Sequence, residues 1–270
     1  MKRLSLVLVM IIAGTALFAQ DLTIIHMNDT HSHIEPEKQG MNKGCGGVVE
    51  QAAYVDSVRC ADGRGNVLLL HAGDFGQGTS YFAELGGDIE IDVINAMAFD
   101  AVCLGNHEFD NGIEELGRRL KNIQCDVLCA NYDFTGSAID GLVKPYAIYE
   151  KGGKKIGVFG LLTDLSSVVS AEIAAQFKYI HPVAVANEYA KFLKDEGCDL
   201  VIALTHLGYE GEDYTDFELA GATRNIDVVI GGHSHTFIEK KGVAKNLDGK
   251  KVIIVTDGKW GLNIGKLTVK

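Results

Sequence analysis

Side chains that can do chemistry occur in five short segments, each directly after an apolar run. The segments are Asn28-Asp29-Thr30-His31, Gly73-Asp74, Gly105-Asn106-His107-Glu108, His206 and Gly231-Gly232-His233-Ser234-His235. Each preceding run is short and rich in aliphatic and β-branched residues, which is typical of a buried strand. Ligands of open α/β sheets bind beyond the carboxyl ends of the strands, where loops converge on a rigid scaffold. We therefore expect the five segments to meet at one rim of the fold.

Seven residues of these segments carry nitrogen or oxygen donors suited to divalent metal ions: Asp29, His31, Asp74, Asn106, His206, His233 and His235. Seven donors are too many for one tetrahedral ion that keeps an open position, so the sequence predicts two ions. Two divalent cations roughly 3.5 to 4 Å apart, bridged by one carboxylate, are used for in-line displacement at phosphorus. Asp74 is the expected bridge. Because two carboxylates cannot neutralise two divalent ions, the site would attract a phosphate dianion and favour a bridging hydroxide.

His107 exceeds the number of ligands that two ions need, which suits it to a different task. Its imidazole could protonate the leaving oxygen or donate to a phosphoryl oxygen. Asp110, three residues further on, is placed to orient the ring and to favour its protonated form. The alternative is that His107 only supports a ligand or the loop itself.

Apolar runs alternate with helical patterns, which predicts an α/β layered domain with buried sheets. The expected strands are Leu22–His26, Val67–His71, Ala101–Leu104, Val127–Ala130, Ile156–Leu161, Leu200–Thr205, Val228–Ile230 and Val252–Thr256. The expected helices are Val48–Arg59, Ile89–Ala98, Ile113–Lys121 and Val183–Glu196, and Asn131–Pro145 is expected to be a long loop. We find no repeat or composition break, so one domain is expected.

The composition limits the classes of function. The net charge is −11, and without residues 1–20 the basic count falls from 25 to 23 against 36 acids, which gives −13. Such a chain repels a phosphate backbone, and no basic stripe with interleaved aromatics provides a local exception. We therefore expect no nucleic-acid partner. The six cysteines leave both free thiols and one or two disulfides open.

Residues 1–20 have the pattern of a secretory signal peptide. They combine basic Lys2 and Arg3 with an apolar run that ends at Phe18, followed by small and polar residues. The run is shorter than the about 20 residues of a comfortable membrane span. We expect cleavage, a periplasmic or secreted chain and no stable membrane anchor; an uncleaved anchor is the alternative.

At these motifs the chain resembles the calcineurin-like metallophosphoesterases, and in particular the amino-terminal catalytic domain of the bacterial 5′-nucleotidase and UDP-sugar hydrolase family. The resemblance also includes Phe75–Gly78, Phe109-Asp110 and Ala130-Asn131, and it runs from Leu22 to about Val269. It implies a four-layer α/β/β/α sandwich of the metallo-dependent phosphatase type. The activity that it implies is phosphomonoester hydrolysis by a metal-bridging hydroxide, with nucleoside 5′-monophosphates as the leading small phosphorylated substrates.

The resemblance also assigns roles to the predicted site residues. One metal would be held by Asp29, His31, Asp74 and His235, and the other by Asp74, Asn106, His206 and His233, with His107 and Asp110 as the catalytic dyad. The two divalent ions would come from zinc, manganese, iron, cobalt or magnesium. Imidazole-rich donor sets lean away from calcium, but they do not choose among the others.

Members of this family usually continue into a carboxy-terminal domain that grips the nucleoside, whereas this sequence ends at Lys270. We therefore expect residues 21–270 to be the catalytic domain alone, with a separately encoded nucleotide-binding domain as partner. Base stacking of roughly 1 to 3 kcal/mol per base would come from that partner, from local residues or from neither.

Two other functions remain open. The same site could cleave 2′,3′-cyclic nucleotides as a phosphodiesterase, or UDP-sugars as a pyrophosphatase. A protein of another class, a non-catalytic metal-binding module, would be expected to have lost ligands or His107, and here every position is filled.

Four aromatic residues lie outside the predicted metal centre. His26 and His71, on strands that point at the site, either support ligands by hydrogen bonds or belong to the core. His33 lies on the rim and could touch substrate. Trp260, the only tryptophan, is expected to close the core rather than to stack on a base.

Overall fold

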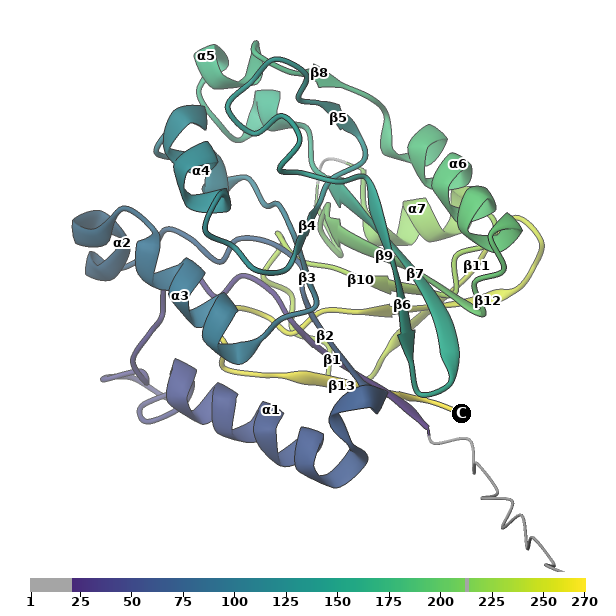
Figure 1. Ribbon diagram of the computed structural model, residues 1–270, viewed down its shortest axis with the longest axis horizontal. Helices are drawn as coiled ribbons and strands as arrows, with labels where there is room; N and C mark the ends of the chain where they lie inside the picture. Colours follow the sequence, from purple (N-terminus) through teal and green to yellow (C-terminus); the bar gives the residue numbers. More distant parts are fainter. Residues whose placement is uncertain (1–20, 212–213) are drawn as a thin grey trace, which may run out of the picture.

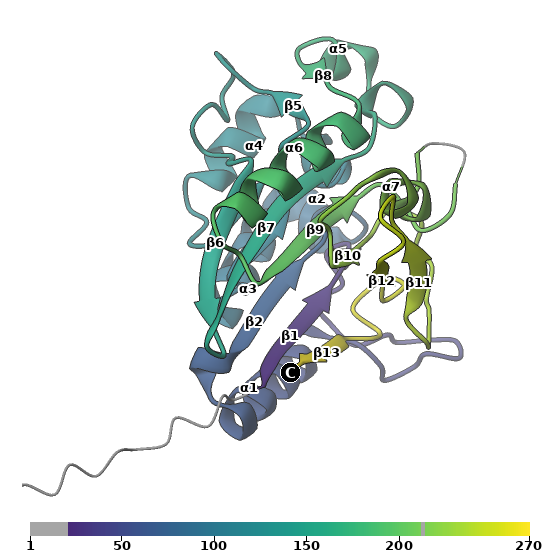
Figure 2. The same cartoon turned by 90° about the vertical axis from the view of Figure 1, so that its right-hand side faces the viewer.

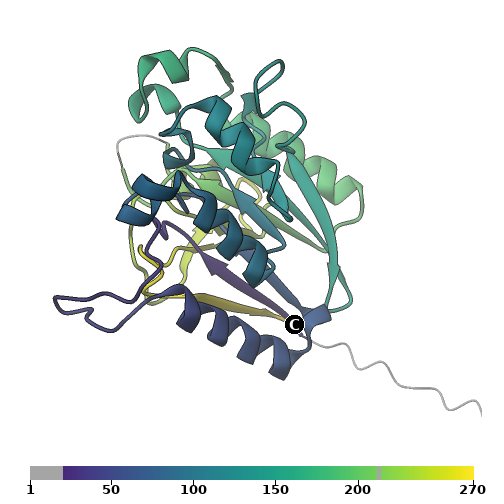
Figure 3. The ribbon, with the colours of Figure 1, turned by 60° about the vertical axis from the view of Figure 1, so that its left-hand side comes forward.

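Two β-sheets pack face to face between two layers of helices in the computed structural model, which describes residues 21–211 and 214–270 (Figure 1). Three apolar clusters fill the three interfaces between these four layers. Figure 2 shows α6 in front of β7. Figure 3 brings α1, α3 and α4 forward across the opposite side of the molecule. The expected four-layer α/β/β/α sandwich is therefore confirmed.

The first sheet has five strands in the order β13 (Gly265–Val269), β1 (Leu22–Met27), β2 (Val67–His71), β3 (Ala101–Cys103) and β4 (Asp126–Leu128). Strands β1 to β4 are parallel, and β13 is antiparallel to β1. Along β1, Ile25 faces the helices and Ile24 faces the other sheet, and both are fully buried. Burial on both faces explains why these strands are almost continuously apolar.

The second sheet has six strands in the order β11 (Gly242–Lys245), β12 (Lys251–Val255), β10 (Val228–Ile230), β9 (Leu200–His206), β7 (Lys154–Leu162) and β6 (Tyr146–Lys151). The four central strands are parallel, and β11 and β6 are antiparallel edges. A small separate sheet joins β5 (Tyr132–Asp133) to β8 (Lys178–Tyr179).

Helices on the first sheet are α1 (Val48–Asp62), α2 (Ser80–Leu85), α3 (Asp88–Met97) and α4 (Ile113–Leu120). Later in the chain come α5 (Ala171–Ala174), α6 (Pro182–Asp195) and α7 (Asp216–Ala222), and three 3₁₀ turns occur at η1 (Arg64–Asn66), η2 (His107–Phe109) and η3 (Leu165–Ser167). Helix α6 begins with Pro182 at its first turn, where proline is favoured because no backbone donor is lost. Its buried Val185, Ala186 and Leu193 pack on the second sheet.

Every expected strand and helix is present, with ends within three residues of the predicted positions. Other elements were not predicted: β6, β11, β13, the small sheet and the short helices α2, α5 and α7. β11 and β13 are edge strands in which partly buried and exposed residues alternate, so neither contains an apolar run. The segment 131–145 is largely irregular as expected, although its start contributes β5.

All six cysteines are free, and Cys103, Cys129 and Cys198 are buried. Within 21–211 and 214–270, no helix is long and apolar enough to cross a membrane. The predicted signal peptide, residues 1–20, lies outside the described residues.

Candidate dimetal site

The five predicted segments converge at the carboxyl ends of parallel strands. Asp29 and His31 follow β1, Asp74 follows β2, and Asn106 follows β3. From the second sheet, His206 ends β9, and His233 and His235 follow the adjacent parallel strand β10. The packing of the sheets places both sets at one rim. The structure brings together six of the seven predicted metal ligands and His107, and Asn106 directly precedes His107 in the chain.

The backbone of the predicted ligands is unusual. Five of the ten non-glycine residues with positive φ among those described are Asp29 (49°), His31 (45°), Asp74 (55°), His233 (76°) and His235 (54°). Such conformations cost about 1–3 kcal/mol each and persist only where the surroundings fix them. Here neighbouring loops hold each other, because the Asp29 and His31 N–H groups donate to the carbonyls of Gly73 and Asp74, both at 3.0 Å. Strain concentrated in this way is typical of a functional site.

Asp29, His31 and His235 form the first donor group, with donor atoms all within 4.8 Å of one another. The Nε2 atoms of His31 and His235 lie 2.8 Å apart. Asp29 Oδ1 is 3.8 Å from His31 Nε2 and 3.5 Å from His235 Nε2. Asp74 Oδ2 lies 3.9 Å from His31 Nε2, so this carboxylate borders the group as an expected bridge should.

Asp74, His206 and His233 form the second group, within the same 4.8 Å limit. His206 Nε2 lies 3.0 Å from Asp74 Oδ2, and its Nδ1 lies 2.7 Å from the carbonyl of Ala72, to which it donates in that tautomer. Asn106 Oδ1 is buried and has no hydrogen-bond partner among the described residues. Because a buried acceptor without a partner costs free energy, this oxygen fits a metal ligand.

The pKa values of His31 and His233 fit the same purpose. Burial lowers the pKa of His31 and of His233 to about 4, so both rings are neutral at neutral pH and each keeps a lone pair for a cation. Burial also raises the pKa of Asp29 to about 7. Burial alone would lower the pKa of His206, but the Asp74 carboxylate raises it to about 10, and His206 in turn holds the pKa of Asp74 below its usual range. His206 would release this proton to a bound cation, because a ligating imidazole must be neutral. The donor set therefore fits two divalent cations that share Asp74.

His107 begins η2 beside the first group, with its ring 5.3 Å from that of His31. Its backbone N–H donates to Asp74 Oδ1 at 2.9 Å, and Nδ1 lies 2.8 Å from Asp110 Oδ2. The hydrogen bond to Asp110 raises the pKa of His107, which favours the imidazolium. About a third of each side chain is exposed (32% for both). The two predicted side chains are thus in contact with each other and partly exposed.

Glu108 supports the site in a way that the sequence analysis did not assign. Its fully buried carboxylate accepts hydrogen bonds from the backbone N–H groups of Asp74 (2.9 Å), Gly76 (3.0 Å) and Gly105 (2.6 Å). It therefore ties the loop after β2 to the loop after β3. The only sequence signal was its place inside the segment that carries Asn106 and His107.

Asn28 plays a similar part on the other side of Asp29. Its Nδ2 donates to Asp29 Oδ2 at 2.6 Å and to the carbonyl of Gly258 at 2.7 Å, while Oδ1 accepts from the N–H of Asp257 at 2.8 Å. The segment after β12 is thereby fixed beside a predicted metal ligand.

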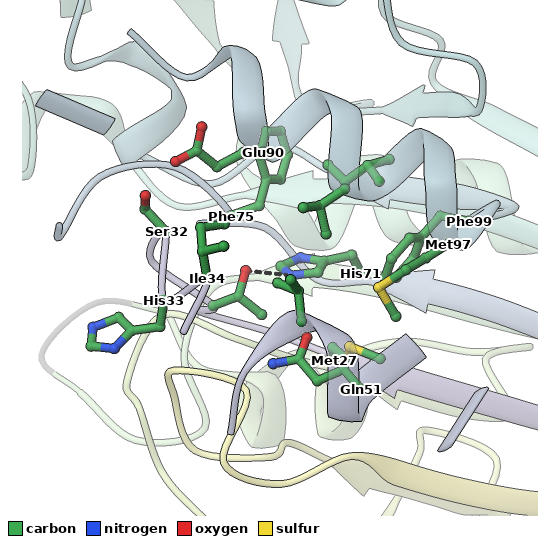
Figure 4. Close-up of a pocket in the computed structure, with 14 residues that line it drawn as sticks. Met27, Ser32, His33, Ile34, Gln51, His71, Phe75, Glu90, Met97 and Phe99 are labelled. Carbon is green, nitrogen blue, oxygen red and sulfur yellow. Dashed lines mark hydrogen bonds between the residues drawn. The ribbon is translucent and has the colours of Figure 1, made fainter. Parts of the chain in front are cut away.

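His26 and His71 are buried and do not join the donor groups. His26 Nδ1 lies 2.6 Å from Asp257 Oδ2. His71 faces an apolar cavity of about 30 Å³, where its Nε2 lies 3.1 Å from Thr30 Oγ1 (Figure 4). Burial lowers the pKa of His71 to about 3, so it is a neutral core histidine that supports the loop after β1 through Thr30.

Comparisons with known proteins agree with this geometry. The family model for calcineurin-like phosphoesterases matches residues 22–237. The chain is 33% identical to a snake venom 5′-nucleotidase of Naja atra over 92% of this chain and 50% of the relative, and 32% identical to an NAD 5′-nucleotidase of Haemophilus influenzae over 93% and 44%. A solved 5′-nucleotidase precursor from Thermus thermophilus superposes with a TM-score of 0.84 at 34% identity, over 93% of this chain and 51% of that one. The chain therefore belongs to the calcineurin-like phosphoesterase family, a family of metal-dependent hydrolases.

The matched part of these relatives is limited. The chain spans about half the length of the relatives named above. The family model covers all the predicted metal ligands, His107 and Asp110.

Proposed function

We propose that this chain hydrolyses small phosphomonoesters, with nucleoside 5′-monophosphates as the leading substrates, and that two divalent cations are required. The observation that carries the proposal is the convergence of Asp29, His31 and His235 on one side of Asp74 and of His206 and His233 on the other. The names of the relatives support the nucleotide substrate.

We assign the predicted ligands as follows. Asp29, His31, Asp74 and His235 would hold one cation, and Asp74, Asn106, His206 and His233 the other. When bound, the cations would supply Lewis acidity toward the phosphoryl oxygens and would lower the pKa of water. The left-handed backbone and the bonds between the loops hold these side chains in place before the substrate arrives, so little reorganisation accompanies the reaction.

His107 would transfer a proton to the leaving oxygen. Its Nδ1 is engaged by Asp110, which leaves Nε2 to face the substrate. Because Asp110 raises the pKa of His107, the ring holds this proton at neutral pH and can donate it as the ester bond breaks.

The substrate is tested with the metal-stripped chain after manganese or zinc is added back. The panel holds a generic aryl phosphate, AMP, a 2′,3′-cyclic nucleotide and a UDP-sugar. We expect hydrolysis of the aryl ester and AMP that disappears with chelator. Cleavage of only the cyclic nucleotide or the UDP-sugar would contradict the monoesterase assignment. A His107→Asn chain that keeps both its metals and its full rate would favour a site that does not use the dyad.

Nucleoside selectivity is a separate part of the proposal. We infer that it comes from residues outside the half of the relatives that this chain matches. Under this proposal the chain alone hydrolyses the aryl ester and AMP with similar kcat/KM. A strong preference for AMP by the chain alone would contradict it.

We also propose that residues 1–20 are a signal peptide and that the mature chain is periplasmic or secreted. The support is the basic, apolar and small-residue pattern of this segment. Intact-mass measurement of the exported protein should show a chain that begins at Asp21. A full-length mass in the membrane fraction would contradict this.

A further inference from the structure

Three side chains outside the predicted ligand set form a stack at the rim of the metal site. The rings of His33 and Trp260 are parallel within 16° with centroids 4.6 Å apart, and Lys259 Nζ lies 4.3 Å from the centroid of the Trp260 ring. Trp260 is only partly buried, so it does not close the core as expected. Figure 4 shows His33 pointing away from the cavity beside His71. We call Lys259, Trp260 and His33 the rim stack.

The rim stack is fixed directly to the predicted metal ligands. The N–H of Trp260 donates to the carbonyl of Asp29 at 2.7 Å, and Trp260 itself has a positive φ of 63°. The N–H of Gly258 donates to the carbonyl of Thr236 at 3.1 Å, so the segment with Lys259 runs beside the segment with His235. A strained aromatic residue held by the backbone of a ligand residue is costly unless the surroundings fix it.

Lys259 carries a charge that no acid among the described residues neutralises. Its ammonium lies instead over the π-face of Trp260. Lys259 lies between Gly258, whose N–H donates to Thr236 next to His235, and Trp260, whose N–H donates to Asp29, so its backbone runs beside two residues of the first donor group. An acid is present at this rim, but Glu37 Oε1 lies 2.7 Å from His33 Nδ1 and pairs with that ring. In a chain with a net charge of −11, an ammonium that has no ion pair of its own is a ready partner for an anion.

We propose that Lys259 is a substrate-positioning residue whose ammonium binds a phosphoryl oxygen of the substrate at the His235 side of the metal site. The stacked rings of Trp260 and His33 hold the lysine stem over the site while leaving its donors free. A cation–π contact is worth only about 0.5–1 kcal/mol at an exposed site, so the ammonium can leave the ring for a phosphate oxygen. This inference rests on the proposed function, because it takes a phosphate ester as the ligand.

The first experiment measures the binding of inorganic phosphate to the metal-loaded chain by calorimetry. The variant is Lys259→Gln, and the matched control is Lys250→Gln, which removes the same charge from an exposed turn at the opposite end of β12. A charge-assisted hydrogen bond predicts about 10-fold weaker phosphate binding in Lys259→Gln and no change in the control. Unchanged binding in Lys259→Gln overturns the inference, as does an equal loss in both variants.

Trp260 gives a second readout that does not depend on turnover, because it is the only tryptophan. Phosphate binding should draw Lys259 away from the indole and produce a saturable fluorescence change in the metal-loaded wild type. The change should be absent in the chelated chain and in Lys259→Gln, and it should return in Lys259→Arg. The same change in Lys259→Gln as in the wild type overturns the inference.

Kinetics separate this inference from the proposed function. Lys259→Gln should raise KM for the aryl phosphate by about the same 10-fold factor and should change kcat less, because the lysine binds the phosphoryl group before and during reaction. If the wild type hydrolyses esters and Lys259→Gln matches it in KM, only the role of Lys259 fails. If the metal-loaded wild type neither binds phosphate nor hydrolyses any ester, both proposals fail.

Discussion

Replacing Glu108 by Gln tests whether a buried carboxylate positions the two loops that carry Asp74 and Asn106. Oε2 accepts from the N–H groups of Asp74 and Gly105, and Oε1 accepts from Gly76, at 2.6 to 3.0 Å. An amide keeps one oxygen, so its NH₂ group must face at least one backbone donor. The loss of one hydrogen bond to a charged group predicts about 2 kcal/mol of lost stability, which corresponds to a Tm lower by about 4–8 °C.

The effect on the site should exceed the effect on the fold. Because both loops shift, we expect metal affinity to fall about 10- to 100-fold, the range found when groups that orient metal ligands are removed. Calorimetric titration with manganese and thermal unfolding of the metal-free chain measure the two effects separately. The control is Glu114→Gln, an exposed residue of α4. A Glu108→Gln chain that melts and binds manganese like the wild type would refute this account of Glu108.

Three further predictions follow from single contacts. Asp110→Asn removes the carboxylate whose hydrogen bond raises the pKa of His107. The alkaline limb of the pH profile of kcat reports the loss of the His107 proton, so this limb should move to lower pH. A limb that does not move would exclude the dyad. Burial raises the pKa of Asp216 from 3.8 to about 7, so the folded chain keeps a proton that the unfolded chain has released, and this residue lowers stability as the pH rises through that window. In denaturant unfolding of the metal-free chain, the free energy of unfolding of Asp216→Asn should therefore rise relative to that of the wild type as the pH increases, by at most about 1.4 kcal/mol per pH unit. The difference should level off above pH 7. A difference that does not change with pH would contradict the raised pKa. In Gly105→Ala, the new methyl would collide with the Asp74 carboxylate, so manganese affinity should fall and stability should drop by about 1–3 kcal/mol. The control is Gly65→Ala, whose new methyl meets nothing within 4 Å. Equal manganese affinities in the two variants would contradict the close approach of Gly105 to Asp74.

The sequence predicted the site because its signals are local and repeated. Each predicted metal ligand follows a strand that is buried on both faces, and such strands stand out as apolar runs, as in Leu22–Met27. Parallel strands then bring their carboxyl ends to one edge, so the convergence of the segments followed from topology. The contact between His107 and Asp110 was predictable in the same way, because the two residues lie three positions apart and meet across one turn.

The elements and contacts that were missed depend on tertiary structure. β13 pairs with β1 across more than two hundred residues, and its alternating exposure gives no apolar run. Helix α7 did carry a signal, since Thr215 and Glu218 form a capping box. The roles of Glu108 and Lys259 could not be predicted, because each depends on distant segments being brought together by both sheets.

The most direct test of the central claim is a titration of the metal-stripped chain with manganese, in which bound metal and aryl phosphate hydrolysis are followed together. The account predicts two ions bound per chain, hydrolysis that rises with the second ion, and loss of both in Asp74→Asn, because Asp74 borders both donor groups. The requirement for two ions would be contradicted by hydrolysis without added metal or by full activity with a single ion. It would also be contradicted by an Asp74→Asn chain that keeps two ions and its rate.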